Sequence, residues 1–372
     1  MTKSKLLEIT KVFFKLGTIS FGGPAAHVAM MEDELVVKRK WVDRQHFLDL
    51  MGATNLIPGP NSTELTMHLG YERGGIPGLF LAGLSFIFPA VTITLLFAFL
   101  YVKYGQLPEV APFIYGIKPA VLAIIAGAIF KLGQKALKNW QLGVLGVGVV
   151  VASLLGVNEI LALLGAGGLG ALFFYLKDKW KADKLNFLPL ILLQVPKLTM
   201  ATWKIFFTFL KVGAVLYGSG YVLFAYLDAE LVSNGFLSRA ELMDAIAVGQ
   251  FTPGPVLSTA TFIGYQLGGF GGALAATIGI FLPSFLFVWL LNPLVAKMRS
   301  SKFLSYFLDC VNIAAVAVMI AVLFAMTKES LVDWKTIAIA LMGFIYTFAY
   351  KKSNSLYTVL GGAVLGYFLS LI

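Results

Sequence analysis

Residues 47–69 read FLDLMGATNLIPGPNSTELTMHL, an apolar stretch with a Pro-Gly-Pro triplet at its middle. Residues 242–266 read LMDAIAVGQFTPGPVLSTATFIGYQ and carry the same triplet. The prolines remove backbone amide donors and glycine holds a helical turn poorly, so neither stretch can form one straight helix. We predict that each folds as a re-entrant helical hairpin. Backbone of this kind is tolerated at membrane depth only where it is buried in protein or lines a wet cavity.

The composition around these stretches is that of a membrane protein. The 372 residues are 58% hydrophobic and 13% charged, with a mean hydropathy of +0.83. A soluble domain carries about 25% charged residues to wet its surface. Apolar runs such as residues 79–102 are long enough to cross a bilayer core, which takes about 20 helical residues. The sequence predicts an all-α polytopic protein of the inner membrane, surrounded by lipid.

Several other classes of protein are excluded by the sequence. The net charge of +10 sits in short clusters between apolar runs, which is typical of cytoplasmic loops and not of a nucleic-acid surface. The single Cys310 excludes an intrachain disulfide and is expected to be a small core residue. There is no GxxxxGK[ST] motif for ATP and no pattern of catalytic or metal-binding side chains. We expect no enzyme activity, no cofactor, no metal and no nucleic-acid partner.

The two triplets belong to an internal duplication. Residues 14–23 (FKLGTISFGG) match residues 210–219 (LKVGAVLYGS), and the matches continue in order through both triplets. This pattern indicates a fused duplication with a linker near residues 177–204. We predict one repeat over residues 1–185 and a second over residues 195–372.

The basic residues predict how the halves are oriented. Each half contains about five membrane-spanning helices plus one hairpin, and an odd number of crossings inverts the second half relative to the first. This arrangement puts 19 of the 29 lysines and arginines inside and 6 outside, as the positive-inside rule requires. We predict two inverted homologous repeats, ten spans in all and both termini external. Whether the first apolar segment, residues 9–28, spans fully is left open.

Inverted repeats with broken helices are typical of secondary transporters, which bind substrate where the repeats meet. One candidate group is the glycine cluster in the first apolar segment of each half: Gly22, Gly23 and Pro24, and Gly218, Ser219 and Gly220. Unwinding there would expose amide donors and turn a helix N-terminus toward an anion. The alternative is close helix packing through small residues.

The second candidate group surrounds the triplets. It comprises Asn55, Pro58, Gly59, Pro60, Asn61 and Ser62 in the first half, and Gln250, Thr252, Pro253, Gly254 and Pro255 in the second. Hydroxyls, carboxamides and exposed amides are suitable donors for a tetrahedral oxyanion. The alternative is that the prolines only break helices and the polar side chains cap them.

Charged residues form the third group. Lys15 and Lys211 occupy equivalent positions, and lysines in membrane spans often mark ion pathways, so together they could balance a dianion. The alternative is that each extends its ammonium group to the interface. His27, Asp49 and Asp244 are candidates for proton coupling. Their alternatives are a structural hydrogen bond for the histidine and helix capping for the carboxylates.

Longer motifs resemble a known family. These are FGGPAAHVAMMEDELV at residues 21–36, WVDRQHFLDLMGATNLIPGPNSTELTMHLGYERGGIPGLFLAGLSFIFPA at residues 41–90, YGSGYVLFAYLDAELV at residues 217–232 and LSRAELMDAIAVGQFTPGPVLSTATFIGYQLGG at residues 237–269. They are similar to the two domains of long-chain members of the chromate ion transporter family. The resemblance implies an inner-membrane secondary transporter that exports chromate by using the proton motive force, with sulfate as a competing oxyanion. Gly218-Ser219-Gly220 lacks the proline of Gly22-Gly23-Pro24, so the halves are expected to contribute unequally.

Three alternatives stay open at this stage. A small-anion channel would not accumulate its substrate against a gradient. An uptake transporter for sulfate or molybdate would use the same chemistry in the other direction, and a membrane-embedded enzyme or scaffold would move no oxyanion. The oligomeric state is also open, a homodimer included.

Overall fold

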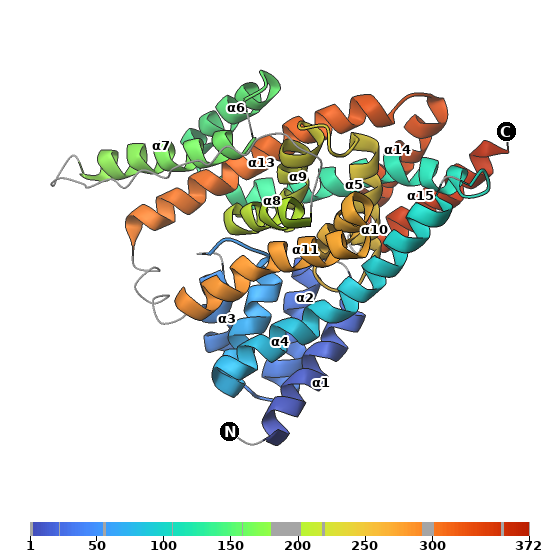
Figure 1. Ribbon diagram of the computed structural model, residues 1–372. Coiled ribbons are helices and arrows are strands. Elements are labelled where there is room, and N and C mark those ends of the chain that lie inside the picture. The colour runs from blue at the N-terminus through green and yellow to red at the C-terminus, as the bar shows by residue number, and fades with distance from the viewer. Residues whose placement is uncertain are drawn as a thin grey trace.

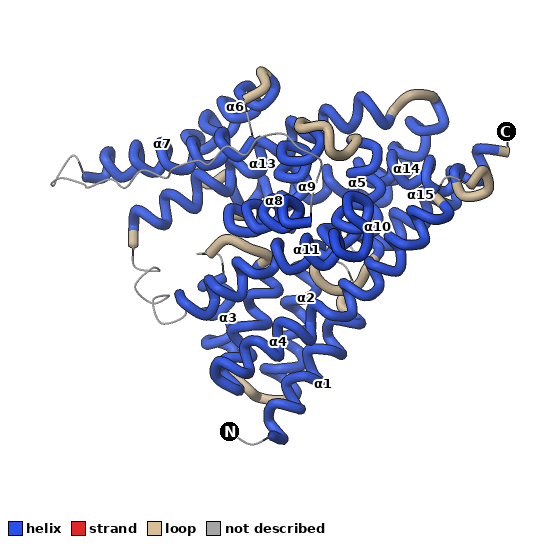
Figure 2. The backbone as a smooth tube through the Cα atoms, in the orientation of Figure 1, coloured by secondary structure: helices blue, strands red, loops and turns tan. Residues whose placement is uncertain are grey.

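The computed structural model describes residues 3–21, 23–54, 57–105, 107–157, 159–179, 202–217, 220–291, 301–350 and 353–371, and these parts of the chain are entirely helical apart from connecting loops (Figures 1 and 2). The first half contains α1 (Lys3–Ile19), α2 (Pro24–Met31), the π-helix η1 (Glu32–Lys38), α3 (Arg44–Thr54), α4 (Asn61–Tyr104), α5 (Ala111–Ala136), α6 (Trp140–Leu154) and α7 (Glu159–Lys179). The second half contains α8 (Thr202–Val215), η2 (Gly220–Val222), α9 (Leu223–Leu227), η3 (Asp228–Val232), α10 (Arg239–Phe251), η4 (Val256–Ser258), α11 (Thr259–Leu291), α13 (Lys302–Ser330), α14 (Trp334–Ala349) and α15 (Ser355–Ser370). The order of elements repeats, down to a π-helical segment at the same place in each half.

The predicted breaks at the triplets are confirmed. Helix α3 ends at Thr54 and α4 begins at Asn61, while α10 ends at Phe251 and is followed by η4 only at Val256. The triplet glycines adopt positive φ angles, 138° at Gly59 and 86° at Gly254, which side chains of L-residues rarely adopt. Each triplet is therefore a turn between two helices.

The expected separation after the first hairpin is confirmed. The sequence predicted that the hairpin ends at Leu69 and that a separate span starts at Leu79, and within α4 two helical pieces meet at Gly74 and Gly75, whose φ and ψ angles are not helical. Helix α11 has the same break at Gly268 and Gly269. The regular helix ends at each glycine pair and the chain turns back, since a Cβ atom on Gly70 would lie 2.5 Å from the carbonyl oxygen of Gly78.

The first apolar segment of the chain is also broken. Helix α1 ends at Ile19 and α2 starts at Pro24, with Gly23 at a φ of 78° before it. Proline suits the first position of a helix because its missing amide would have no partner there. In the second half, α8 ends at Val215 and η2 begins at Gly220. Both expected spans therefore consist of two helical pieces, with non-helical backbone at Ser20, Phe21 and Gly23 in the first half and at Leu216 and Tyr217 in the second.

Four long helical segments dominate the apolar body. Within the described residues, the segments long and apolar enough to cross a membrane are Asn61–Tyr104, Ala111–Ala136, Val256–Leu290 and Lys302–Ser330. Helices α6, α7, α14 and α15 are apolar but shorter. The number of crossings stays a prediction.

The halves are interlocked (Figure 1). Helix α1 lies along α4 and α8 lies along α11, each within its own half, and α4 crosses α11. The last two helices of each half are exchanged: α14 and α15 pack on α5, and α6 and α7 pack on α13. A Cβ atom on Gly116 of α5 would lie 2.1 Å from the carbonyl oxygen of Gly362, so this crossing depends on the glycines. Cys310 is fully buried at the α7–α13 crossing, which confirms its core position.

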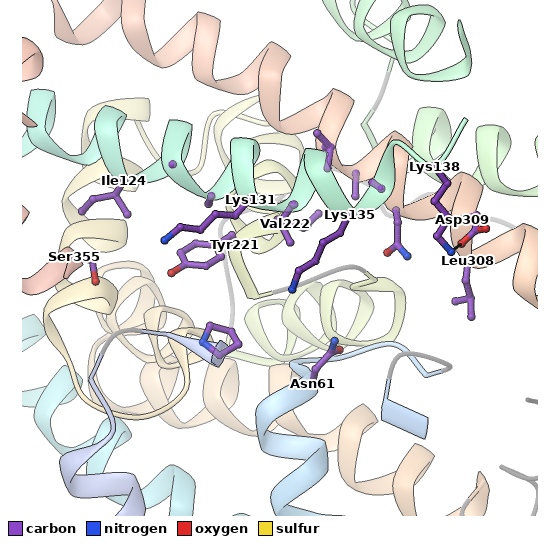
Figure 3. Close-up of a pocket in the computed structure, with 18 of the residues that line it drawn as sticks. Asn61, Ile124, Lys131, Lys135, Lys138, Tyr221, Val222, Leu308, Asp309 and Ser355 are labelled. Atoms are coloured by element: carbon purple, nitrogen blue, oxygen red, sulfur yellow. Dashed lines mark hydrogen bonds and ion pairs between the residues drawn. The ribbon is translucent and has the colours of Figure 1, made fainter. Parts of the chain in front are cut away.

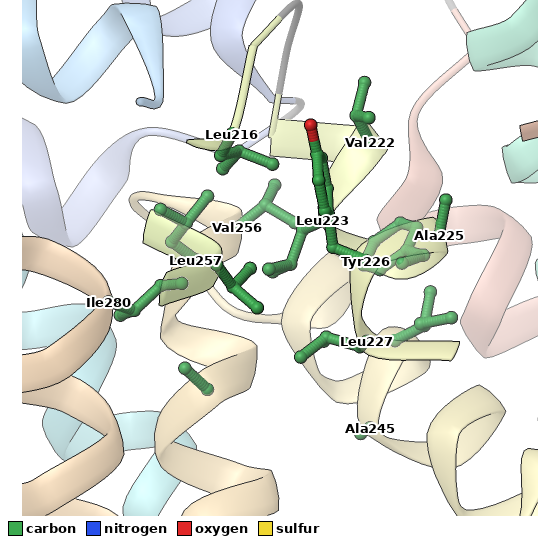
Figure 4. Close-up of a cluster of buried hydrophobic side chains, with 14 of the residues drawn as sticks. Leu216, Val222, Leu223, Ala225, Tyr226, Leu227, Ala245, Val256, Leu257 and Ile280 are labelled. Atoms are coloured by element: carbon green, nitrogen blue, oxygen red, sulfur yellow. The ribbon is translucent and has the colours of Figure 1, made fainter. Parts of the chain in front are cut away.

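A hydrophobic cluster supports the broken segment of the second half (Figure 4). Leu216, Leu223 and Leu257 are fully buried there, between the end of α8 and the second triplet. The Tyr226 hydroxyl donates a 2.7 Å hydrogen bond to the Val215 carbonyl oxygen. Because α8 ends at Val215, this oxygen has no amide donor from a following helical turn. Apolar packing thus holds the irregular backbone in place.

Candidate functional site

A cavity of about 640 Å³ lies between the long helices α5 and α13 and the broken helices (Figure 3). Its polar and charged lining comprises Asn61, Lys131, Lys135, Lys138, Tyr221, Ser301, Ser305, Asp309, Asn312, Thr347, Ser353, Asn354, Ser355 and Thr358. Pro24 of α2 lines it as well. Residues of both halves therefore form one polar chamber inside an otherwise apolar protein.

Lysines on α5 give this cavity its positive charge. Lys131 and Lys135 are four residues apart and so project from the same face of the helix. Lys138 is 2.6 Å from the Asp309 carboxylate, which compensates its charge. Within the described part of the chain, Lys131 and Lys135 form no ion pair, and Figure 3 shows Lys135 extended toward the side of the cavity that carries Asn61. The cavity therefore holds two uncompensated positive charges.

The opposite side of the cavity is built from the starts of two helices. Pro24 begins α2 and Asn61 begins α4, so both helix N-termini meet the cavity. His27 links them: its Nδ1 is 3.1 Å from Ser62 Oγ and its Nε2 is 3.2 Å from the Ser20 carbonyl oxygen. A neutral ring therefore donates from Nε2 to Ser20 and accepts at Nδ1 from the serine hydroxyl. These contacts give buried His27 a positioning role.

The two triplets make reciprocal contacts across the halves. The Gly59 amide donates to the Leu216 carbonyl oxygen at 2.6 Å, and the Gly254 amide donates to the Ser20 carbonyl oxygen at 2.9 Å. Pro58, Pro60, Pro253 and Pro255 are buried beside them. Each triplet thus closes onto the broken first helix of the other half, and its glycine amide is occupied in this conformation.

Lys15 and Lys211 lie away from the cavity. Lys15 is 3.7 Å from Glu34 and Lys211 is 2.7 Å from Glu230, and the two lysine side chains are 59% and 43% exposed. The two ion pairs occupy equivalent positions in the halves. This setting matches the alternative in which each lysine extends toward the surface.

The polar residues before the second triplet form a separate buried group. Thr94 of α4 contacts the hydroxyls of Thr252 and Ser258 at 3.4 and 3.1 Å. Gln250 is buried, and its Nε2 has no hydrogen-bond partner among the described residues. Gly220 is buried against Leu257. None of these residues lines the cavity as it stands.

The two matched aspartates differ in their surroundings. Asp244 is buried, accepts a 2.7 Å hydrogen bond from the Tyr101 hydroxyl and lies 3.6 Å from Lys118 Nζ. Asp49 lies on a partly exposed face of α3, where Gln45 contacts it at 3.4 Å. Equivalent sequence positions therefore do not have equivalent chemistry.

Four predicted site residues fall outside the described residues: Gly22, Asn55, Gly218 and Ser219.

The sequence analysis did not identify the lysines of the cavity. It assigned Lys131, Lys135 and Lys138 to a cytoplasmic loop, because they follow the apolar run that ends at residue 130. The structure extends α5 to Ala136, so the first two lysines are helical. Their spacing of four residues was the available signal, since it places both on one helix face.

Broken helices around a basic cavity, inside an apolar helical body, define a multi-pass membrane transport protein. The family model described as "Chromate transporter" matches residues 7–171 and again residues 203–367. The chain belongs to the chromate transporter family and contains its domain twice, as a transporter and not an enzyme.

Relatives match nearly the full length. "Chromate transport protein" from Cupriavidus metallidurans is 31% identical over 373 residues, which cover 97% of this chain and 92% of the relative. "Probable chromate transport protein" from Synechococcus elongatus is 33% identical over 359 residues, with 93% and 91% covered. "Uncharacterized transporter YwrB" from Bacillus subtilis is 30% identical over 177 residues, 46% of this chain but 89% of its own, as a duplication would give. No solved structure matches the chain.

Proposed function

We propose that this protein exports a small divalent oxyanion, with chromate as the first candidate and sulfate as the second, by using the proton motive force. The observation that carries the proposal is the cavity that Lys131 and Lys135 line together with the N-termini of two broken helices. Two positive charges match the charge of a chromate or sulfate dianion. Several relatives, including one from Pseudomonas aeruginosa, carry the name chromate transport protein, which is consistent with this choice of substrate.

The electrostatics of the cavity suit transient binding. Helix N-termini attract anions through their partial positive charge and their amides that lack helical partners. The lysines are exposed to the cavity, where water screens their charge. A hydrated anion would be attracted without being held so tightly that release becomes slow. This is the balance that a carrier needs.

The location of the cavity supports export. Residues of the α5–α6 connection, the start of α13 and the α14–α15 connection line it, and the positive-inside prediction puts these three connections in the cytoplasm. We propose that the halves face opposite sides of the membrane and that this conformation is open to the cytoplasm. An anion would then enter from the inside and leave after the halves rearrange.

The proton motive force requires a proton-carrying group. His27, Asp49 and Asp244 remain candidates from the sequence. Asp244 is the buried carboxylate of the three, and Lys118 and Tyr101 can stabilise its charged form. These contacts tie Asp244 to α4 and α5, while its other oxygen, Oδ1, has no hydrogen-bond partner among the described residues.

The test is oxyanion flux in proteoliposomes. Wild type should accumulate radiolabelled chromate in response to a proton gradient, and an uncoupler should collapse the accumulation. The double variant Lys131→Ala/Lys135→Ala should lose flux by about tenfold or more, because each removed charge weakens attraction of a dianion. Lys103→Ala, on an exposed turn of α4 outside the cavity lining, is the matched control and should behave as wild type. Flux that ignores the uncoupler would identify a channel, and no movement of chromate or sulfate would reject the proposal.

A further inference from the structure

Glu64 is a buried carboxyl group that the site described above does not use. It lies in the first turn of α4, four residues after Pro60, and its side chain is fully buried. Neither of its carboxyl oxygens has a hydrogen-bond partner among the residues that the structure describes. No lysine or arginine in the described ranges forms an ion pair with it. An acidic side chain in this setting requires an explanation.

The carboxyl group lies at the contact between the halves. A Cβ atom built on Gly59 would be 1.9 Å from Glu64 Oε1 and 2.5 Å from Ser284 Oγ, so both oxygens border the same small space. Ser284 belongs to α11 of the second half, and its buried hydroxyl is the polar group that faces the carboxyl group of Glu64. The Gly59 amide bonds to Leu216 of the second half beside them. Separation of the halves at this contact would expose Glu64.

Two titratable side chains among the described residues lie near Glu64, a tyrosine and a histidine. Tyr217, next to Leu216, is within electrostatic reach of the carboxyl group. Buried His68 follows one turn later on α4, on the same helix face. An ionised carboxylate without a cation or donors is strongly destabilised away from water. In the closed contact Glu64 is therefore a neutral acid, and its ionised form requires an opening that admits water.

The second half has no counterpart of this group. Its triplet glycine, Gly254, faces Ala90 of the first half, where a Cβ atom would be 3.0 Å from the alanine methyl group. Ala90 and Ser284 are matched positions of the repeats, and Thr259 follows the second triplet where Glu64 follows the first. The contact around Gly59 therefore contains an acidic side chain, and the equivalent contact around Gly254 has none at the matched position.

We propose that Glu64 is the proton-binding site that couples proton movement to opening and closing of the contact between the halves. The inference rests on the proposed function as an oxyanion exporter and names the residue that would supply its proton dependence. A protonated Glu64 permits the closed contact around Gly59. Release of the proton, once water reaches the carboxyl group, leaves a carboxylate that resists closure until a proton returns.

Two transport measurements on the full chain in proteoliposomes test the assignment. Glu64→Gln keeps the shape of the neutral acid but binds no proton. It should retain chromate counterflow within about twofold of wild type and lose accumulation driven by a pH gradient. Glu72→Gln, the same change on an exposed turn of α4 beside His46, should accumulate chromate as wild type does. Gradient-driven accumulation by Glu64→Gln would overturn the proposal, and so would loss of counterflow in a folded variant, because that assigns Glu64 to the anion path.

An infrared measurement separates this proposal from the proposed function. Wild type at neutral pH should show the carbonyl absorption of a protonated carboxylic acid, and Glu64→Gln should lack it. The result holds whether or not the wild type moves chromate, and a spectrum unchanged by the substitution would reject Glu64 as the protonated group. If Glu64→Gln fails to fold, Ser284→Ala leaves the carboxyl group in place and should shift the pH dependence of its absorption. An unshifted pH dependence would count against the proposal.

Discussion

The backbone amide of Gly59 donates a 2.6 Å hydrogen bond to the carbonyl oxygen of Leu216, a residue of the other half of the chain. Gly254 makes the corresponding bond to Ser20. A reciprocal exchange of this kind follows from an approximate two-fold relation between the halves. Each triplet turn is completed by the broken first helix of the opposite half, so neither half forms the transport region alone.

The Gly59 turn should not tolerate a side chain. At a φ of 138°, Gly59→Ala strains the backbone and drives its Cβ into Glu64 Oε1 and Ser284 Oγ. We expect a loss of stability of about 1–3 kcal/mol together with loss of chromate flux. Thermal unfolding in detergent and proteoliposome flux measure the two effects. Gly148→Ala on α6, where a Cβ meets nothing within 4 Å, is the control, and a Gly59→Ala protein with wild-type stability would contradict the turn geometry.

The lysine at position 15 should matter less for flux than the cavity lysines. The sequence analysis offered both lysines as partners of a dianion, with an interfacial position as the alternative, and both side chains pair with glutamates outside the cavity. Exposed ion pairs contribute about 0–1 kcal/mol, so we now expect each single variant to keep most of the wild-type flux. Initial rates at low chromate concentration, measured beside Lys131→Ala, give the comparison. Equal loss in Lys15→Ala and Lys131→Ala would restore the original assignment.

Asp244 should contribute to stability more than to proton coupling. Asp244→Asn removes the charge that compensates Lys118 and weakens the contact with Tyr101. We expect destabilisation of about 1–3 kcal/mol, since a partly buried ammonium group loses its partner. Detergent unfolding curves measure this cost. Chromate accumulation should remain dependent on the proton gradient, and loss of that dependence in a stable Asp244→Asn protein would make Asp244 the coupling residue.

The orientation of the halves can be tested by labelling, because Cys310 is the single native cysteine and is buried. In a Cys310→Ala background, Lys40→Cys and Lys138→Cys should react with an impermeant reagent from the cytoplasmic side. Lys103→Cys and Lys335→Cys should react from the opposite side, because the inverted arrangement separates these positions. Labelling of Lys335→Cys from the same side as Lys40→Cys would reject the inverted arrangement.

Local chemistry made much of the fold predictable. Pro58, Gly59 and Pro60 interrupt a helix wherever they occur, because missing amides and a positive φ are properties of the residues themselves. The membrane class followed from composition, and the duplication followed from matched segments. The separation of the helical pieces before and after Gly74 and Gly75 also followed from the sequence, because two adjacent glycines let the backbone leave the helical conformation.

Contacts between distant segments were decided only by the tertiary structure. The sequence analysis singled out Lys15 and Lys211, but which lysines line the cavity depended on how α5 packs between α13, α14 and α15. Lys15 and Lys211, which are matched in the two halves, form ion pairs with nearby glutamates. Lys131 and Lys135 instead line the cavity. The burial of Glu64 against Ser284 likewise needed two helices from different halves. The backbone conformations that a residue can adopt depend on its own type and can be read from the sequence. The direction and surroundings of its side chain depend on helices that are far away along the chain.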